Sequence, residues 1–263
     1  IGAINQHFSL GGNTSSLIEM SRPWNDFIER FASPEVRTVL RYIIESLHDL
    51  SNPTLVKILP ALGDKHCNTQ SINSMSLRNR TYYLTQQSHV QAILGNFKKS
   101  YDLYWKTYTS GFNRTYTGNY KMALFASVFS LSIAHLYEGA PAWKRVWYRL
   151  QLRWHRKLLS IFIESAPHYV EAKIIFIEGL LSHIKRKPIN KTIKLLTSAL
   201  KTAQKHRDNV DEAFIGEFLG KLLIRHELSD LALSPLLCAK AAYERWGILI
   251  KVAELDPIIL TLS

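Results

Sequence analysis

The stretch that decides the fold covers residues 143–188 and has the sequence WKRVWYRLQLRWHRKLLSIFIESAPHYVEAKIIFIEGLLSHIKRKP. Its apolar residues recur every three or four positions, which is the spacing of a helix with one buried side. Pro167 and Pro188 interrupt this pattern, and the residue before a proline is disfavoured in a helix. We therefore expect two long helices in this stretch, joined near Ala166 and ending near Lys187.

The same pattern continues on both sides, from about Thr81 to the end of the chain. Helical segments of about 15–22 residues follow one another, and two of them form a pair of about 40 residues. No window alternates apolar and polar residues for long enough to propose a sheet. The sequence predicts an all-α fold, a helical-repeat solenoid of stacked helical hairpins. The breaks fall near Gly95, 111–118, 139–141, 166–167, 187–188, 207–209 and 228–235.

Three further parts precede this repeat. Residues 1–20 are rich in Gly, Ser and Asn and are expected to be loose. Residues 21–62 are expected to be helical, because Ser33-Pro34-Glu35 supplies a cap residue, a proline at the first helical position and an acid in the first turn. Residues 63–80 are polar without a period and predict a linker. The repeat domain then covers residues 81–263.

Charge is distributed unevenly along the chain. The net charge is +12, and residues 121–210 contain 16 Lys and Arg against 5 Asp and Glu, a balance of +11. Residues 211–263 contain 5 basic and 8 acidic residues, a balance of −3. The basicity therefore belongs to one stretch, and an acidic partner would meet a local patch.

A helical wheel of the segment that begins at Trp143 separates two stripes. Trp143, Trp147 and Trp154 lie on one side with other apolar residues, and a row of arginines lies about 140° away. We expect the tryptophans to be core and the arginines to face solvent, because an unpaired Arg is costly to desolvate. The basic residues expected to bind a partner are Arg145, Arg149, Arg153, Arg156, Lys185, Arg186 and Lys187. A solvated face without a partner stays open as the other interpretation.

Sequence motifs for catalysis or for a cofactor are missing. The chain contains no nucleotide-binding glycine motif, no zinc-protease motif, no nucleophile elbow and no Cys/His cluster with metal spacing. We therefore expect a protein that is not an enzyme and that holds no cofactor and no metal. Candidate pairs such as Asp211-Glu212 follow Asn209, where acids complement a helix N-terminus.

Localisation signals are weak. Cys67 and Cys238 form no pair with metal or redox spacing, which favours a reducing compartment. Four Asn-x-Ser/Thr sequons, at Asn13, Asn79, Asn113 and Asn190, point the other way. The least charged run, residues 122–137, is shorter than the roughly 20 residues of a membrane span. We expect an intracellular, cytoplasmic protein without a membrane partner. Because the chain begins with Ile1 rather than Met, we also expect it to be an excerpt or a processed product of a longer protein.

The C-terminal stretch carries a resemblance. Residues 239–247, AKAAYERWG, are followed by Lys251-Val252, Leu255 and Pro257. This run resembles the closing helix pair, A..AY.RWGA..KV..L, of the tetratricopeptide-like (TPR-like) region that follows the ATPase module in large multidomain signalling proteins. That family includes hybrid histidine kinases, serine/threonine kinases and soluble adenylyl cyclase-like proteins. Ala232 falls at the start expected for this helix, and Ile248 replaces an Ala.

A second match lies upstream. Ala166-Pro167, Lys173 and Glu178 resemble the AP.N..HK....AE helix of the same family, with Tyr169 in place of the usual Asn and Ala172 in place of the usual His. The resemblance covers residues 120–260, and its strong positive charge is atypical of the family. It implies a TPR-like helical repeat that acts as a non-catalytic scaffold for protein–protein interaction.

The closing motif also has a direct physical interpretation. Small residues at helical spacing form a thin face on which a neighbouring helix can pack closely. Tyr243 and Trp246 are expected to fill the groove at the helix end, and Gly247 to supply the positive φ that ends the helix. The structural motif therefore comprises Ala232, Ala239, Ala242, Tyr243, Trp246 and Gly247.

Three function classes follow from these observations. The first is a scaffolding repeat in a signalling protein that binds an acidic protein surface or other domains of its parent. The second is a basic nucleic-acid-binding helical protein, which requires the Lys and Arg of residues 121–210 to converge on one surface with exposed aromatics. The third is a membrane-surface or secreted glycosylated protein. We take the first as the working hypothesis.

Overall fold

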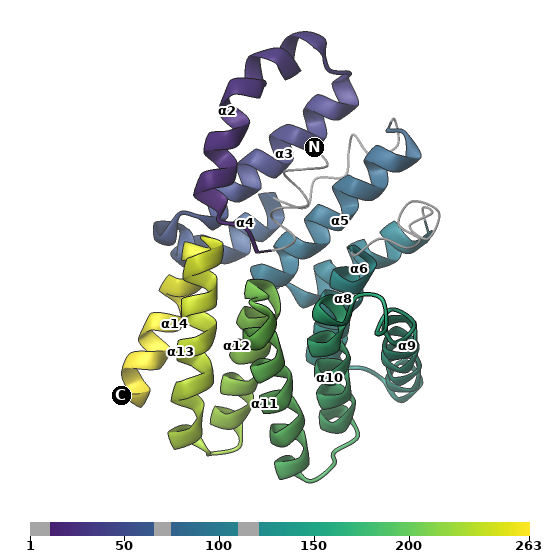
Figure 1. Cartoon of the computed structure of the whole chain (residues 1–263), viewed down its shortest axis with the longest axis vertical. Helices are drawn as coiled ribbons and strands as arrows, with labels where there is room; N and C mark the ends of the chain where they lie inside the picture. The colour runs from purple at the N-terminus through teal and green to yellow at the C-terminus, as the bar shows by residue number, and fades with distance from the viewer. Residues whose placement is uncertain (1–10, 66–74, 110–120) are drawn as a thin grey trace. The chain divides into compact units, whose positions relative to one another are not determined.

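A computed structural model describes residues 11–65, 75–109 and 121–263 of the chain (Figure 1). Every regular element within these ranges is a helix and none is a strand, which confirms the predicted all-α fold. The chain divides into two compact units, each described here by itself. The first unit comprises residues 1–117 and 243–256, and the second comprises residues 118–242 and 257–263. The boundaries between the units do not coincide with the predicted linker at 63–80.

The first unit begins with neighbouring helices in contact. Helix α2 packs on α3, α3 on α5, and α5 on α6. Helix α3 starts as expected, because the Ser33 side chain accepts a hydrogen bond from the Val36 backbone N–H and Pro34 is its first residue. The helices of this part are α2 Thr14–Phe31, α3 Pro34–Leu50, the 3₁₀ helix η1 Pro53–Ile58, α4 Leu59–Lys65, α5 Leu77–Ile93 and α6 Phe97–Thr109.

Two boundaries in this unit differ from the expected ones. Helix α2 begins at Thr14, inside the segment expected to be loose, because the Asn13 side chain accepts from the Ser16 N–H at 3.2 Å and so caps the helix. Helix α5 begins at Leu77, inside the predicted linker, where Glu35 accepts from Ser76 N and Asn79 Nδ2, both at 2.9 Å. Residues 66–74 of that linker lie outside the described residues.

The second unit is built from paired helices. Helices α8, α10 and α12 begin at residues 121, 167 and 209, which gives spacings of 46 and 42 residues, close to the expected length of a helix pair. Consecutive helices contact one another from α8 to α12, and α10 also contacts α8 and α12. The helices are α8 Lys121–Leu136, α9 Ala142–Ser160, α10 Pro167–Ile184, α11 Ile189–His206 and α12 Asn209–Arg225, with α13 Ser229–Trp246 and α14 Leu249–Leu262 contributing to both units.

Three consecutive helices of this unit end in the same way. Arg186, Arg207 and Glu227 follow α10, α11 and α12 and have φ of 50°, 55° and 60°. In each case the next residue's N–H reaches back five residues to a carbonyl oxygen, as Lys187 N does to Ser182 O at 3.1 Å. This is the Schellman ending, in which one residue in the left-handed region closes the helix. These endings could not be predicted from the sequence, because none of the three positions holds the glycine that usually marks them.

Helices α12 and α13 approach closely. A Cβ atom added to Gly216 would lie 2.7 Å from the Pro235 carbonyl oxygen, and one added to Gly220 would overlap the Leu236 side chain. Pro235 lies inside α13, which begins at Ser229, so the expected break at 228–235 extends too far along the chain. A proline in the second turn deprives only the Leu231 carbonyl of its helical donor, and Leu231 is at the exposed side of the helix.

The least charged run forms a buried helix, as expected. Helix α8 covers most of residues 122–137, and Phe125, Phe129 and Ile133 on it are almost completely buried. Within the residues that the structure describes, no helix has both the length and the apolar character that crossing a membrane requires.

Candidate functional site

Helix α9 positions the basic residues singled out by the sequence. It contains six Lys and Arg and no acidic residue. One narrow side, formed by Tyr148, Gln151, Leu152, His155 and Leu159, is buried, and α9 contacts α8 and α10. The His155 Nδ1 atom lies 3.2 Å from the Ser130 hydroxyl of α8, which gives this buried ring a hydrogen-bond partner.

The tryptophans of α9 are not where the sequence analysis expected them. Trp143, Trp147 and Trp154 are 71%, 45% and 42% exposed, so the prediction that they form the core side is wrong. The expectation took the more hydrophobic side of α9 as the buried one, and the tryptophans are the largest apolar residues on that side. The helix instead buries the side that carries Tyr148 and His155, because Ser130 satisfies the imidazole and removes most of the cost of burying it.

The four arginines of the row lie at or near the surface. Arg153 and Arg156 are exposed, whereas Arg145 and Arg149 are half-buried. Arg145 donates to the Glu138 carbonyl oxygen at 2.6 Å and lies over the Tyr137 ring, 5.8 Å from its centroid. Arg156 pairs with Glu178 at 2.8 Å. Two of the four therefore have specific partners within the second unit.

The Schellman turn after α10 presents the second basic cluster. Lys185, Arg186 and Lys187 are all exposed, and the turn is fixed by hydrogen bonds from the Arg186 and Lys187 N–H groups to His183 and Ser182. A helix end without these hydrogen bonds would leave the backbone conformation of the turn free to vary. The three side chains are therefore held at one end of α10, beside α9.

The structure brings both clusters together around one groove. The groove has a volume of about 590 Å³ and lies between α9, α10 and the start of α11. Its only acidic residue is Glu178, which already pairs with Arg156. We call it the basic groove. It is lined by Arg153, Arg156, Lys157, Ser160, Glu178, Leu181, Ser182, Lys185, Lys187, Lys191 and Leu195.

A smaller hollow of about 180 Å³ adjoins the basic groove through Lys185, which lines both. Arg145, Arg149 and Arg186 line the smaller hollow. Partial burial, and then repulsion from Arg153, Lys187, Arg149 and Arg156, lowers the pKa of the Lys185 ammonium. Such crowding of like charges means that a bound anion would relieve repulsion as well as gain attraction.

All seven predicted basic residues thus line one of two adjoining hollows. Lys157 and Lys191 complete the basic groove, although the sequence analysis did not single them out. Lys157 follows Arg156 directly along the chain, but the wheel places it about 100° away from Arg156 and so outside the row. Lys191 belongs to the next helix, and only its contact with α10 brings it to the groove.

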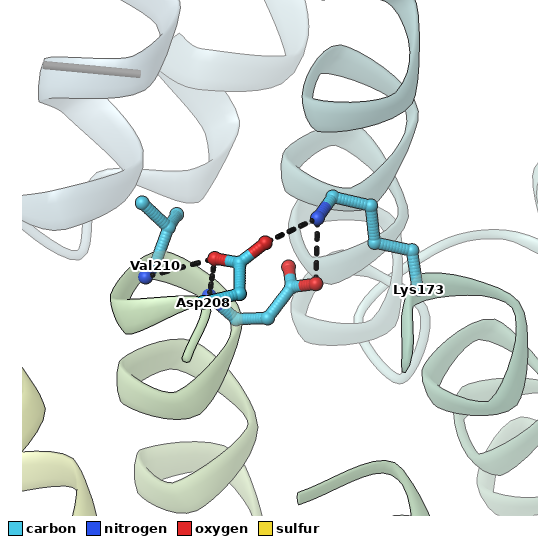
Figure 2. A network of polar contacts seen from close by, with 4 residues as sticks. Lys173, Asp208 and Val210 are labelled. Carbon is cyan, nitrogen blue, oxygen red and sulfur yellow. Dashed lines mark hydrogen bonds and ion pairs between the residues drawn. The ribbon is translucent and has the colours of Figure 1, made fainter. Parts of the chain in front are cut away.

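A buried charge cluster lies elsewhere in the second unit. Figure 2 shows the Lys173 ammonium of α10 between two carboxylates at the start of α12, 2.9 Å from Asp208 and 2.6 Å from Asp211. Asp208 also caps α12, because it accepts from the Val210 and Asp211 N–H groups. The acids at this helix start were expected, but their burial and their partner were not.

The electrostatics of this cluster follow from its burial. Burial opposes the charge on Lys173, but the carboxylates of Asp208 and Asp211 outweigh it and raise the pKa of the ammonium. Burial, and then repulsion from Asp208, raises the pKa of Asp211 to about 7. These residues line neither of the two hollows described above, and the cluster joins α10 to the start of α12.

The residues of the closing motif are structural. Ala232, Ala239 and Ala242 are completely buried, and Gly216 of α12 lies against Ala239. Tyr243 and Trp246 are buried with stacked rings, 6.3 Å between centroids. Gly247 has φ of 80° and ends α13. These residues hold the helix end and present no group to a ligand.

Within the described ranges, no group of three or more His, Cys, Asp or Glu residues is placed to hold a metal ion. Cys238 is a free thiol that accepts a hydrogen bond from Gln204 Nε2 at 3.2 Å. No protein-family model matches the chain, and no curated protein or solved structure matches it either. The basic groove is therefore the candidate functional site on its geometry and charge alone.

Proposed function

We propose that the chain is a non-catalytic interaction module whose basic groove binds an acidic segment of a partner protein. The observation that carries this proposal is the groove itself, where six Lys and Arg side chains from α9, the turn after α10 and α11 surround about 590 Å³ with one acid among them. Electrostatic complementarity of this kind speeds association and selects partners of opposite charge. Leu181, which is buried, and Leu195, which is half-buried, also line the groove and would contact the apolar parts of such a segment.

A protein segment fits the groove better than a single-stranded nucleic acid does. Binding of single strands combines phosphate contacts with stacking of bases on aromatic rings. The exposed tryptophans of α9 are centred about 140° around the helix from the Arg row and do not line the groove. The groove lining itself contains no aromatic residue.

The resemblance to the TPR-like region of large signalling proteins supports the wider setting. Helix pairs of about 40 residues that pack on their neighbours are what such a repeat requires. We infer a scaffolding role within a larger intracellular signalling protein, in which the acidic segment belongs to a partner or to another domain of the parent. The solenoid arrangement is part of this proposal.

The test compares two double charge reversals that change the net charge equally. Arg153→Glu with Lys185→Glu alters the basic groove, whereas Lys201→Glu with Lys205→Glu alters exposed lysines of α11 outside it. Binding of a fluorescent glutamate-rich peptide and of a single-stranded poly-uridine RNA is measured by anisotropy. We expect the groove variant to bind the peptide about tenfold more weakly or worse, and the control to bind within about twofold of the wild type.

The outcomes separate the two classes of partner. Equal loss of peptide binding in both variants would show that only net charge matters and would overturn the groove. Tight RNA binding that is lost in the groove variant, with weak peptide binding throughout, would replace the proposal by the nucleic-acid function. Circular dichroism melting of each variant shows that it is folded.

A further inference from the structure

Helix α9 carries an exposed apolar ridge that the basic groove does not use. Its members are Trp143, Val146, Trp147, Leu150 and Trp154, which are 42–71% exposed. Ile161, one residue beyond the C-terminus of α9, is 69% exposed on the same side. A row of large apolar side chains on one helix marks an interaction surface more often than scattered exposed residues do. We call these six residues the α9 ridge.

The position of the α9 ridge on its helix defines its shape. The buried side of α9 is centred on Tyr148 and Leu152, and Leu150 lies close to the opposite direction on the wheel. Trp143 and Trp154 lie less than about 100° from Leu150 around the helix, which is the rotation between successive residues. The ridge is thus a convex edge turned away from α8 and α10, and it suits a partner that receives a projecting helix.

The helix that carries the α9 ridge bears only positive charges, although Glu164 is exposed just beyond Ile161. Helix α9 contains no acidic residue, and the turn after α10 adds Lys185, Arg186 and Lys187 beside it. On the wheel Arg153 is the member of the Arg row nearest the ridge, and Lys157 falls between Val146 and Leu150. Both are exposed. Long Lys and Arg side chains can extend sideways from an apolar surface while their charged ends stay in water.

We propose that the α9 ridge binds the surface of an anionic lipid bilayer. Tryptophan and leucine on one side of a helix, with Lys and Arg beside them and no acid, are the composition of helices that lie in the bilayer interface. The indole rings would lie at the headgroup level, where their N–H groups keep polar partners. The flanking cations would meet the phosphate groups of anionic lipids.

This inference reverses an expectation from the sequence. From the sequence we expect no membrane partner, and we expect Trp143, Trp147 and Trp154 in the core. Their exposure makes them available to a partner. The proposed binding is peripheral, since the helix would lie along the interface and would not cross the bilayer. The apolar side chains of the α9 ridge do not line the basic groove, although Arg153 and Lys157 border both.

The experiment uses the whole chain and vesicles of two compositions. Sedimentation with vesicles of phosphatidylcholine alone, or of phosphatidylcholine with phosphatidylserine, measures the partition coefficient. The ridge variant, Trp143→Gln with Leu150→Gln, replaces two apolar side chains that are already exposed, so it should fold. The matched control, Leu231→Gln with Leu237→Gln, removes two exposed leucines of α13, 57% and 46% exposed.

We expect the wild type to bind only the vesicles that contain phosphatidylserine. The ridge variant should partition about tenfold more weakly or worse, and the control within about twofold of the wild type. Brominated lipids should quench tryptophan fluorescence in the wild type on binding. The ridge variant should bind the glutamate-rich peptide as the wild type does, which separates this proposal from the groove function.

Three results would overturn the proposal. The first is a wild type that does not bind the anionic vesicles. The second is a ridge variant that binds them as well as the wild type, which would assign the attraction to charge alone. The third is a wild-type dimer in analytical ultracentrifugation that the ridge variant loses, because the ridge would then cover a second copy of the chain.

Discussion

His155 and Trp143 show that hydrophobicity alone does not decide which side of α9 is buried. The imidazole of His155 lies inside, 1% exposed, next to the Phe129 ring and the Ser130 hydroxyl. The indole of Trp143 on the same helix is 71% exposed. Burial of a polar group costs little when a hydrogen bond replaces its water, so the fit of a side chain to its neighbours can outweigh its hydrophobicity.

The first prediction concerns the pH dependence of stability. Burial lowers the pKa of His155 from 6.5 to about 3. In the unfolded chain this imidazole takes up a proton below about pH 6.5, whereas in the folded chain it stays neutral until about pH 3. The unfolding free energy should therefore fall as the pH falls, by about 2–3 kcal/mol between pH 7 and 4.5.

The measurement is the free energy of unfolding by urea at several pH values, for the wild type and for His155→Gln. The glutamine carbonyl oxygen can still accept from Ser130. The difference between the two proteins isolates this residue from the carboxylates, and it should shrink toward low pH. A difference that does not change with pH would show that His155 is not the buried, neutral group seen here.

The second prediction concerns Trp246, which is 2% exposed and stacks on Tyr243. Trp246→Ala should lower the unfolding free energy by about 3–5 kcal/mol, because it removes a large buried aromatic and leaves a cavity. Trp143→Ala is the matched control and should change it by less than about 0.5 kcal/mol. Chemical denaturation measures both, and similar losses in the two variants would contradict the assignment.

At the element scale, the ends of helices allow a prediction about two glycines. Gly95 and Gly247 have φ of 77° and 80° and follow α5 and α13. A Cβ at Gly95 would meet no atom within 4 Å, whereas at Gly247 it would collide with the Thr14 hydroxyl and lie 2.9 Å from the Thr14 nitrogen. A side chain introduced at either position would be strained by the positive φ, but only at Gly247 would it also collide with a neighbouring residue.

Gly95→Ala should therefore destabilise by about 1–2 kcal/mol, the cost of a left-handed residue with a side chain. Gly247→Ala should cost about 1–3 kcal/mol more, because overpacking adds to the strain. Thermal and urea unfolding of both variants measure the difference. Equal effects would mean that Thr14 moves aside at no cost.

A fourth prediction concerns the link between α10 and α12. Lys173→Met leaves the carboxylates of Asp208 and Asp211 buried without their cation and should cost about 3–5 kcal/mol. Adding Asp211→Asn should restore part of this loss, because one buried charge disappears. Lys221→Met is the control. It breaks an i,i+4 pair with Glu217 that is partly open to solvent and should cost less than about 1 kcal/mol. Additive losses in the double variant would contradict the coupling.

Much of the element pattern could be predicted from the sequence. The cap at Ser33, the prolines at 167 and 188 and the glycine at 247 lie where helices start or end, because these residues act through local backbone geometry. Pro235 could not be placed, since its helix tolerates it only through its position in the second turn. The start at Thr14 depends on one hydrogen bond from Ser16 to Asn13.

The candidate site was predictable only in part, for a reason that belongs to the whole molecule. Local periodicity groups Arg153 with Arg156, and charge runs group Lys185 with Lys187, because these residues are neighbours along the chain. Their meeting with Lys191 depends on how α9, α10 and α11 pack. The burial of His155 in place of the tryptophans depends on Ser130, which belongs to another helix.

The charge distribution of the whole chain supports a last prediction, about the rate of binding. Residues 121–210 carry a balance of +11 and residues 211–263 one of −3, so the positive field is concentrated near the basic groove and should guide an acidic segment toward it. Association rates of this kind fall as salt screens the field, whose range is about 10 Å at 0.1 M ionic strength.

We expect the association rate constant of the glutamate-rich peptide to fall about tenfold or more between low and physiological salt, with a smaller change in its dissociation rate. Stopped-flow fluorescence measures both rates. The Lys201→Glu with Lys205→Glu variant has the same net charge as the groove variant but an intact groove. Its association rate should fall by no more than about twofold and its dissociation rate should stay at the wild-type value, since the field weakens slightly and the contacts in the groove remain. An association rate that salt leaves unchanged would mean that short-range contacts, and not the field of the basic stretch, capture the partner.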